Sequence, residues 1–174
     1  MGKLIRVPAA IAAAAAVFAV AVTLGASRAW AQQKAGNLKQ QIVGAWRLVS
    51  IYNEEGGKKT HNFSEKPIGL VIYDGSGNIM QYLSKPEVPR FAVANRLKGT
   101  DAEYRAVMQS VLAGFGTYTI EGDAIIIKWI ASSYPNRAGT TEKRPLKIAG
   151  DELTTVNPTA ASGGIAYTKF ARVK

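Results

Sequence analysis

The stretch at residues 44–52, GAWRLVSIY, constrains the fold more than any other part of the chain, because apolar side chains alternate along it. Successive side chains of an extended strand point to opposite faces. The alternation therefore predicts a strand whose inward face carries Trp46, Leu48, Ser50 and Tyr52. A large indole at the start of a strand can close one end of a small β-barrel, and Gly44 permits another segment to approach there.

The C-terminus offers a partner for this indole. Arg172 is the third residue from the end of the chain. A guanidinium stacked on Trp46 would join the first strand to the last through a cation–π contact worth roughly 0.5–2 kcal/mol. The alternative is that Trp46 is a core aromatic without such a partner and that Arg172 is a solvated charge near the terminus.

Further strand candidates follow, separated by turn signals. The DGSGN sequence at residues 74–78 predicts a hairpin, because glycine and asparagine accept positive φ. Pro86 and Pro89 predict that the segment after the expected strand 79–84 is a loop and not part of a sheet interior, since proline has no amide donor for the ladder. The expected strands are residues 44–53, 69–73, 79–84, 115–121, 124–133, 140–149, 152–156 and 165–172.

One segment changes to a helical period. Thr100 can cap a helix with Glu103 three residues later, and Tyr104, Val107 and Val111 recur at helical spacing, so we expect a helix over residues 100–113. Eight strands joined mostly by hairpins predict an all-β fold, an eight-stranded antiparallel up-and-down β-barrel, with this helix inserted between the third and fourth strands. A barrel of about eight strands has room for one small ligand.

The N-terminal 31 residues have the features of a secretory signal peptide. A basic start is followed by an alanine-rich apolar run and by an A-x-A site at residues 29–31. We expect cleavage after Ala31, a polar lead over residues 32–43, a barrel domain over residues 44–174, and export to the periplasm or medium of a bacterium. Since the run approaches the roughly 20 residues that span a bilayer, an uncleaved anchor is the alternative. After cleavage we expect no stable membrane anchor.

Composition excludes several classes of function. The net charge is +10, but the basic residues are scattered, which argues against a nucleic-acid partner. With no cysteine and a single histidine, His61, the chain lacks a ligand set for a transition metal, so we expect no metal and no cofactor. The acidic residues gather at expected turns, which argues against a pair of catalytic carboxylates inside a barrel.

Several short segments occur in a specific order, namely residues 42–50, 67–73, 89–91, 103–106, 115–118, 135–136 and 170–172. In this order they resemble the bacterial lipocalin-like domain family, within the lipocalin and calycin superfamily. Gly44, Trp46 and Arg172 look like the lipocalin structural signature. The resemblance implies a barrel whose central cavity holds small apolar molecules. The chain departs from the family pattern at Arg137, where an aromatic residue often stands.

Aromatic residues on or beside the expected strands supply a candidate ligand site, because small-molecule pockets are lined by apolar and aromatic groups. We place Trp129 inward because its neighbour Lys128 should reach water, and we place Met80 and Tyr82 inward on the third strand. Arg90 or Asn136 would orient a polar group of the ligand. The candidate residues are Tyr52, Tyr73, Met80, Tyr82, Arg90, Phe91, Tyr118, Trp129, Tyr134 and Asn136.

These features predict an exported protein that binds a small apolar or amphipathic molecule in the barrel lumen, through a mouth near residues 86–91 and the helix. One alternative is a barrel with a filled core that acts in structure or protein interaction. Another is a cofactor-free cyclase or isomerase with Tyr118 or Tyr52 as acid or oxyanion donor. We favour binding over catalysis, assign no catalytic residue and leave the oligomeric state open.

Overall fold

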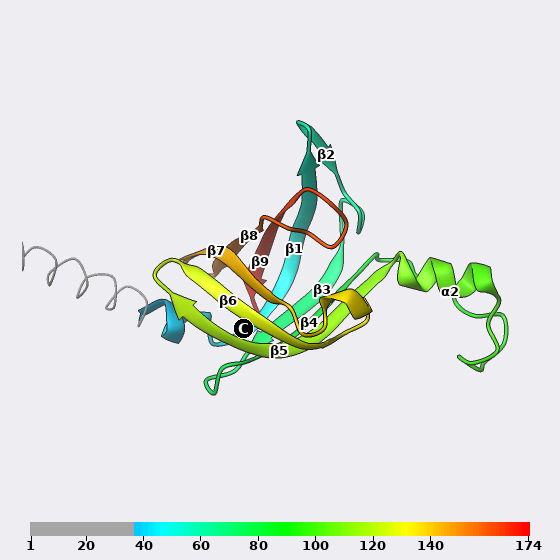
Figure 1. Cartoon of the computed structure of the whole chain (residues 1–174), viewed down its shortest axis with the longest axis horizontal. Coiled ribbons are helices and arrows are strands. Elements are labelled where there is room, and N and C mark those ends of the chain that lie inside the picture. The colour runs from blue at the N-terminus through cyan, green and yellow to red at the C-terminus, as the bar shows by residue number, and fades with distance from the viewer. Residues whose placement is uncertain (1–36) are drawn as a thin grey trace, which may run out of the picture.

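The strands follow one another around a ring because tight turns connect most of them. At the turn after β3, for example, the Asn78 amide donates to Asp74 Oδ1 at 2.8 Å and Gly77 has a φ of +93°. The computed structural model describes residues 37–174 (Figure 1). Its elements are β1 (Gly44–Glu55), β2 (Lys58–Thr60), β3 (Ile68–Tyr73), β4 (Asn78–Ser84), α2 (Asp101–Met108), β5 (Val111–Glu121), β6 (Ala124–Ser132), η1 (Pro135–Arg137), β7 (Thr141–Ala149), β8 (Glu152–Asn157) and β9 (Ile165–Arg172).

The sheet closes because β1 pairs with both ends of the ring. The antiparallel order is β2-β1-β3-β4-β5-β6-β7-β8-β9, with an additional pairing of β1 to β9. Strand β2 pairs only with the far end of β1, through residues 53–55, so it is an appendage and eight strands form the barrel. The predicted eight-stranded up-and-down barrel, with one helix between the third and fourth barrel strands, is confirmed.

The helix is shorter than we predicted and no residue of it is buried. Thr100 and Glu103 form the expected capping box, but α2 ends at Met108, and the residues from Val111 onward pair with β4. The helix ends early because β5 begins at Val111, whose β-branched side chain favours a strand and which pairs with β4. Gly116 lies within β5 as expected, and its backbone is so close to β6 that a Cβ there would clash with the Lys128 carbonyl oxygen. Figure 1 shows α2 set to one side of the barrel.

A bulge in β1 reverses the predicted inward face of its second half. The register with β9 shifts between Leu48 and Ser50, so β1 holds one extra residue there. An extra residue in a period-2 pattern exchanges the two faces of a strand. Ile51 and Asn53 therefore point inward, at 7% and 6% exposure. Tyr52 was predicted to face the lumen, but it stacks on Tyr167 with ring centroids 5.1 Å apart, on the other face of the sheet.

The predicted contact between the two ends of the barrel chain is present. The Arg172 guanidinium lies 4.1 Å from the centroid of the Trp46 ring, and it donates hydrogen bonds to the carbonyls of Gln41 and Val43. The indole of Trp46 is fully buried and donates to the Ile42 carbonyl at 2.8 Å. Residues 37–42 are helical, so this segment and the stacked pair close one end of the barrel.

Core side chains fill the half of the barrel nearest this closed end. Tyr73 and Tyr118 belong to this core, since their rings meet edge to face at 5.1 Å and the Tyr118 hydroxyl donates to the Asp74 carbonyl at 2.7 Å. Burial raises the pKa of the Tyr73 phenol to about 12. The fully buried members include Ile42, Trp46, Val71, Ile79, Ile125, Ile127, Trp129 and Leu153. Any ligand space is therefore confined to the opposite half.

The expected signal peptide, residues 1–31, and the start of the polar lead lie outside the described residues. Within residues 37–174, no helix combines the length and the apolar character needed to cross a bilayer.

Candidate ligand-binding site

The half of the barrel away from Trp46 contains a cavity of about 470 Å³. It lies among the C-terminal ends of β1 and β4 and the N-terminal ends of β5, β7 and β9, together with η1 and the loop between β8 and β9. Ligand cavities for drug-sized molecules have volumes of roughly 300–1,000 Å³. The space therefore suits one small molecule.

Apolar side chains form much of the cavity wall. They come from four different strands and from the connection between β2 and β3, which contributes Phe63. The wall residues are Ile51, Leu83, Val111, Leu112, Ala166 and Phe170. Burial of apolar ligand surface against such a wall contributes roughly 25 cal/mol per Å² before the costs of association.

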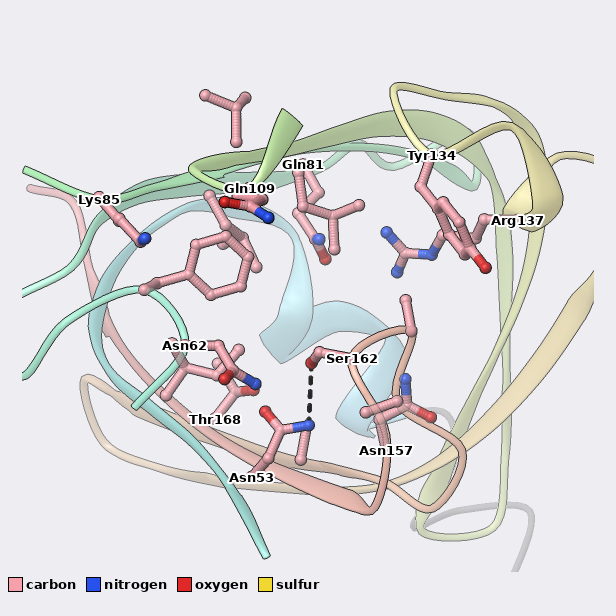
Figure 2. Close-up of a pocket in the computed structure, with 18 of the residues that line it drawn as sticks. Asn53, Asn62, Gln81, Lys85, Gln109, Tyr134, Arg137, Asn157, Ser162 and Thr168 are labelled. Atoms are coloured by element: carbon pink, nitrogen blue, oxygen red, sulfur yellow. Dashed lines mark hydrogen bonds between the residues drawn. The ribbon is translucent and has the colours of Figure 1, made fainter. Parts of the chain in front are cut away.

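Uncharged polar groups also line the cavity, and Figure 2 shows them distributed around it. Asn53, Asn157 and Thr168 are buried and line it. The Asn53 amide nitrogen donates to Ser162 Oγ at 3.0 Å and to the Gly163 carbonyl. These bonds fasten the loop between β8 and β9 to β1, so that the loop forms part of the cavity boundary.

A buried charged cluster, formed by Arg137, Glu142 and Arg144, lines the cavity from the side of β7 and η1. Arg137 Nε donates to Glu142 Oε1 and Arg144 Nε donates to Glu142 Oε2, each at 3.0 Å. The Arg137 guanidinium also lies 3.6 Å from the centroid of the Trp129 ring. Arg137 and Arg144 are 5% and 9% exposed, so this charge lies in the barrel interior and not on the surface.

Electrostatics keeps Glu142 and Arg137 ionised at neutral pH. Burial alone would raise the pKa of Glu142, but the two guanidiniums outweigh it and hold that pKa below its usual value. Burial, together with the neighbouring Arg144, lowers the pKa of Arg137 to about 10. Two guanidiniums and one carboxylate leave the cluster with one positive charge in excess.

Local sequence explains how the cluster is assembled. The alternation of β7 places Glu142, Arg144 and Leu146 on its inward face. Pro135 starts η1 with the fixed φ that suits a first helical position, and Gly139, at a φ of +78°, turns the chain back. The Gly139 amide donates to the Trp129 carbonyl at 2.9 Å. This turn places Arg137 over the Trp129 ring.

Comparison with known proteins identifies the fold family. The family described as "Lipocalin-like domain" matches residues 43–169, which is nearly the whole barrel. The chain belongs to the lipocalin-like domain family. A curated relative, the 4'-hydroxy-3'-methoxypropiophenone carrier protein ppsC of Aspergillus oryzae, is 37% identical over 89 residues, covering 45% of this chain and 80% of that protein. The crystal structure of a mutant of the fluorescent protein UnaG aligns with 77% of this chain and with 97% of the UnaG chain. The sequence identity is 11% and the TM-score is 0.35.

Two of the residues predicted for the site of this lipocalin-like domain are at or next to the cavity. Tyr134 lines it. Trp129 faces inward as predicted and is fully buried beneath Arg137, while Lys128 is exposed. Tyr73 and Tyr118 are inward but belong to the packed half, and they do not line the cavity.

The predicted inward face of β4 is wrong. Met80 and Tyr82 are 61% and 45% exposed, whereas Gln81 and Leu83 are buried and line the cavity. Pairing decides this, because Met80 lies opposite exposed Ile72 of β3. Because the outward face of β4 also carries apolar side chains, residue type alone does not show which face of this strand is inward.

The predicted polar and aromatic groups of the loops also lie away from the cavity. Arg90 is exposed, and Phe91 packs edge to face on Tyr104 at 5.5 Å. Asn136 is exposed on η1, and its neighbour Arg137 is the buried residue. The position that departs from the family pattern is therefore the one that reaches the cavity.

Sequence reasoning missed the charged cluster. A signal for it was present in the alternation of β7, because Glu142 and Arg144 share a face with Leu146. Each of them also lies opposite an inward isoleucine of β6, Ile127 and Ile125 respectively. Charged residues at such positions are read as solvated, and only the strand pairing shows that they are inside. Among residues 37–174, no group of three or more metal-binding side chains occurs.

Proposed function

We propose that this lipocalin-like protein binds one small amphipathic molecule in the lumen of its barrel. The observation that carries the proposal is the cavity of about 470 Å³, whose wall combines apolar side chains with polar groups. A core filled by side chains, which would favour a purely structural role, would leave no such space.

The curated relative supports this proposal and narrows the ligand class. Its name describes a carrier of an aryl ketone that bears hydroxyl and methoxy groups. A molecule of this kind combines an apolar ring with a few oxygen atoms, which matches the mixture of apolar and polar groups in the cavity wall. We infer that a small aromatic or aliphatic molecule with at least one polar oxygen group is the ligand of this chain.

Catalysis has less support. Of the tyrosines considered as acid or oxyanion donor, Tyr118 donates its hydroxyl to the Asp74 carbonyl and Tyr52 lies on the outer face of the sheet. Neither hydroxyl reaches the cavity, so the cyclase or isomerase hypothesis loses its proposed groups.

Binding is tested with a neutral fluorescent probe, N-phenyl-1-naphthylamine, and with a variant that fills the lumen. Ala166 lines the cavity and Ala171 is on the opposite face of the same strand. We expect Ala166→Phe to weaken probe binding by about tenfold or more, and Ala171→Phe to leave it unchanged, since one ring displaces ligand volume. Equal affinities in folded samples of both variants would refute lumen binding. Native mass spectrometry of protein purified from its own cells should show a bound small molecule.

We also propose that the protein is exported and that its mature form begins at Gln32. The support is the signal-like sequence of residues 1–31. Intact-mass measurement of protein from its native cells would test this, because cleavage after Ala31 removes a defined mass. A full-length mass in the cytosolic fraction would contradict it.

A further inference from the structure

We propose that the ligand is a monoanion with a carboxylate group and that Arg137 binds this carboxylate inside the barrel. This inference rests on the proposed function, because it names the chemical class of the molecule in the same cavity.

The charge of the cluster is not balanced within the described part of the chain. Glu142 is shared by Arg137 and Arg144, and all three side chains are at most 11% exposed. Buried charges are normally paired, because an uncompensated ion is costly to remove from water. A ligand with one negative charge would neutralise the excess, whereas a dianion would reverse it.

The hydrogen bonds of the two arginines differ, and they point to Arg137. Arg144 directs both Nε and Nη2 to Glu142 Oε2. Arg137 directs Nε to Glu142, its Nη1 is buried without an acceptor among the described residues, and its Nη2 makes no hydrogen bond to them either. A buried donor without a partner is uncommon in native proteins. The Arg137 guanidinium therefore has bonding capacity that an acceptor from a ligand can use.

The orientation of Arg137 is fixed before any ligand arrives. Stacking on Trp129 at 3.6 Å sets the plane of the guanidinium, and the Nε bond to Glu142 sets its rotation in that plane. A planar guanidinium held in this way matches the two oxygens of a carboxylate. Figure 2 shows Arg137 reaching into the cavity, with Tyr134 beside it.

The remaining cavity wall fits the rest of such a ligand. Asn53, Asn157 and Thr168 carry no charge and do not compete with Arg137 for an anion. The apolar lining residues, such as Ile51 and Leu83, would pack against a ring or a short chain. Lys85 also lines the cavity, but it is only partly buried, so water solvates its charge; it attracts an anion without adding to the buried excess.

The test compares two ligands of the same shape, 3-phenylpropanoate and 3-phenylpropanamide, by isothermal titration calorimetry. We expect the wild-type protein to bind the acid about ten- to hundred-fold more tightly than the amide, the range that a hydrogen bond to a charged group provides. In Arg137→Gln the preference should disappear, because the acid loses much more affinity than the amide. The control Arg96→Gln, at an exposed arginine of the loop after β4, should retain the preference.

Several outcomes overturn the inference. Equal affinities for acid and amide in the wild type refute it, and they do so even if Arg137→Gln fails to fold. A preference that survives in folded Arg137→Gln, or that vanishes when the ionic strength is raised, would assign it to diffuse surface charge. If N-phenyl-1-naphthylamine binds in the lumen and the acid shows no advantage, only the carboxylate inference fails. If none of the three molecules binds, the proposed function fails with it.

Discussion

Replacing Glu142 with glutamine tests the charged cluster without changing the volume of the side chain. The variant keeps a group that can accept hydrogen bonds but removes the carboxylate shared by two buried guanidiniums. The side chains of Arg137 and Glu142 are 4% and 11% exposed. Removal of one partner from a buried ion pair costs about 3–5 kcal/mol, because the other charge is left uncompensated.

We expect a loss of about 3 kcal/mol in the free energy of unfolding, the lower end of that range, because both arginines line a cavity in which water can solvate part of the charge. For a domain of this size the loss corresponds to a decrease of roughly 10 °C in Tm. Urea denaturation followed by circular dichroism measures it. The matched control is Glu121→Gln, because the Glu121–Lys143 pair is 61% and 65% exposed. A surface pair of this kind contributes about 0–1 kcal/mol.

The pH dependence provides an independent check. The folded-state pKa of Glu142 lies below its usual value of 4.5. The carboxylate therefore stabilises the fold above that value, and its contribution is lost as the pH falls through the lower folded-state pKa. The stability difference between wild type and Glu142→Gln should be complete at neutral pH and should shrink in acid. A loss no larger than that of Glu121→Gln, or a difference that does not change with pH, would refute the buried cluster.

Three further predictions concern the packed half of the barrel. Trp46→Ala should lower the free energy of unfolding by about 3–5 kcal/mol, since the indole is fully buried; a loss below about 1 kcal/mol would contradict the packing. Gly116→Ala should cost about 3 kcal/mol in the same urea assay, because its Cβ would lie 2.1 Å from the Lys128 carbonyl oxygen. Gly75→Ala, where a Cβ meets nothing within 4 Å, should be close to neutral, and equal losses would refute the steric argument. Burial raises the pKa of Tyr73 to about 12, so Tyr73→Phe should leave the ultraviolet titration of tyrosine unchanged up to about pH 11; a smaller absorbance change below that pH would show that Tyr73 is accessible.

Much of the architecture could be predicted from local sequence. Turn residues such as those at 74–78 separate the strands, and hairpin connections leave an antiparallel meander as the natural topology. The position of Arg172 near the C-terminus suggested a contact with Trp46, which the structure contains. The turns and strands can be predicted because each depends on a few neighbouring residues.

The candidate site was predicted less well, and three of the errors have the same cause. Tyr52, Met80 and Tyr82 were placed inside on the basis of strand alternation, but each lies outside or largely exposed. Alternation gives two faces and does not say which one is inward. A bulge in β1 and the register of β4 against β3 make that choice, and both depend on residues far away in the sequence.

The sequence by itself determined that this chain forms antiparallel strands, where most of them begin and end, and that its first and last barrel strands meet at Trp46. Only the tertiary structure decided which half of the barrel is filled and which is hollow. It also decided that Arg137, Glu142 and Arg144 face the hollow half. The physical reason is that a residue's face depends on strand pairing and register, whereas its tendency to form a strand depends on local sequence.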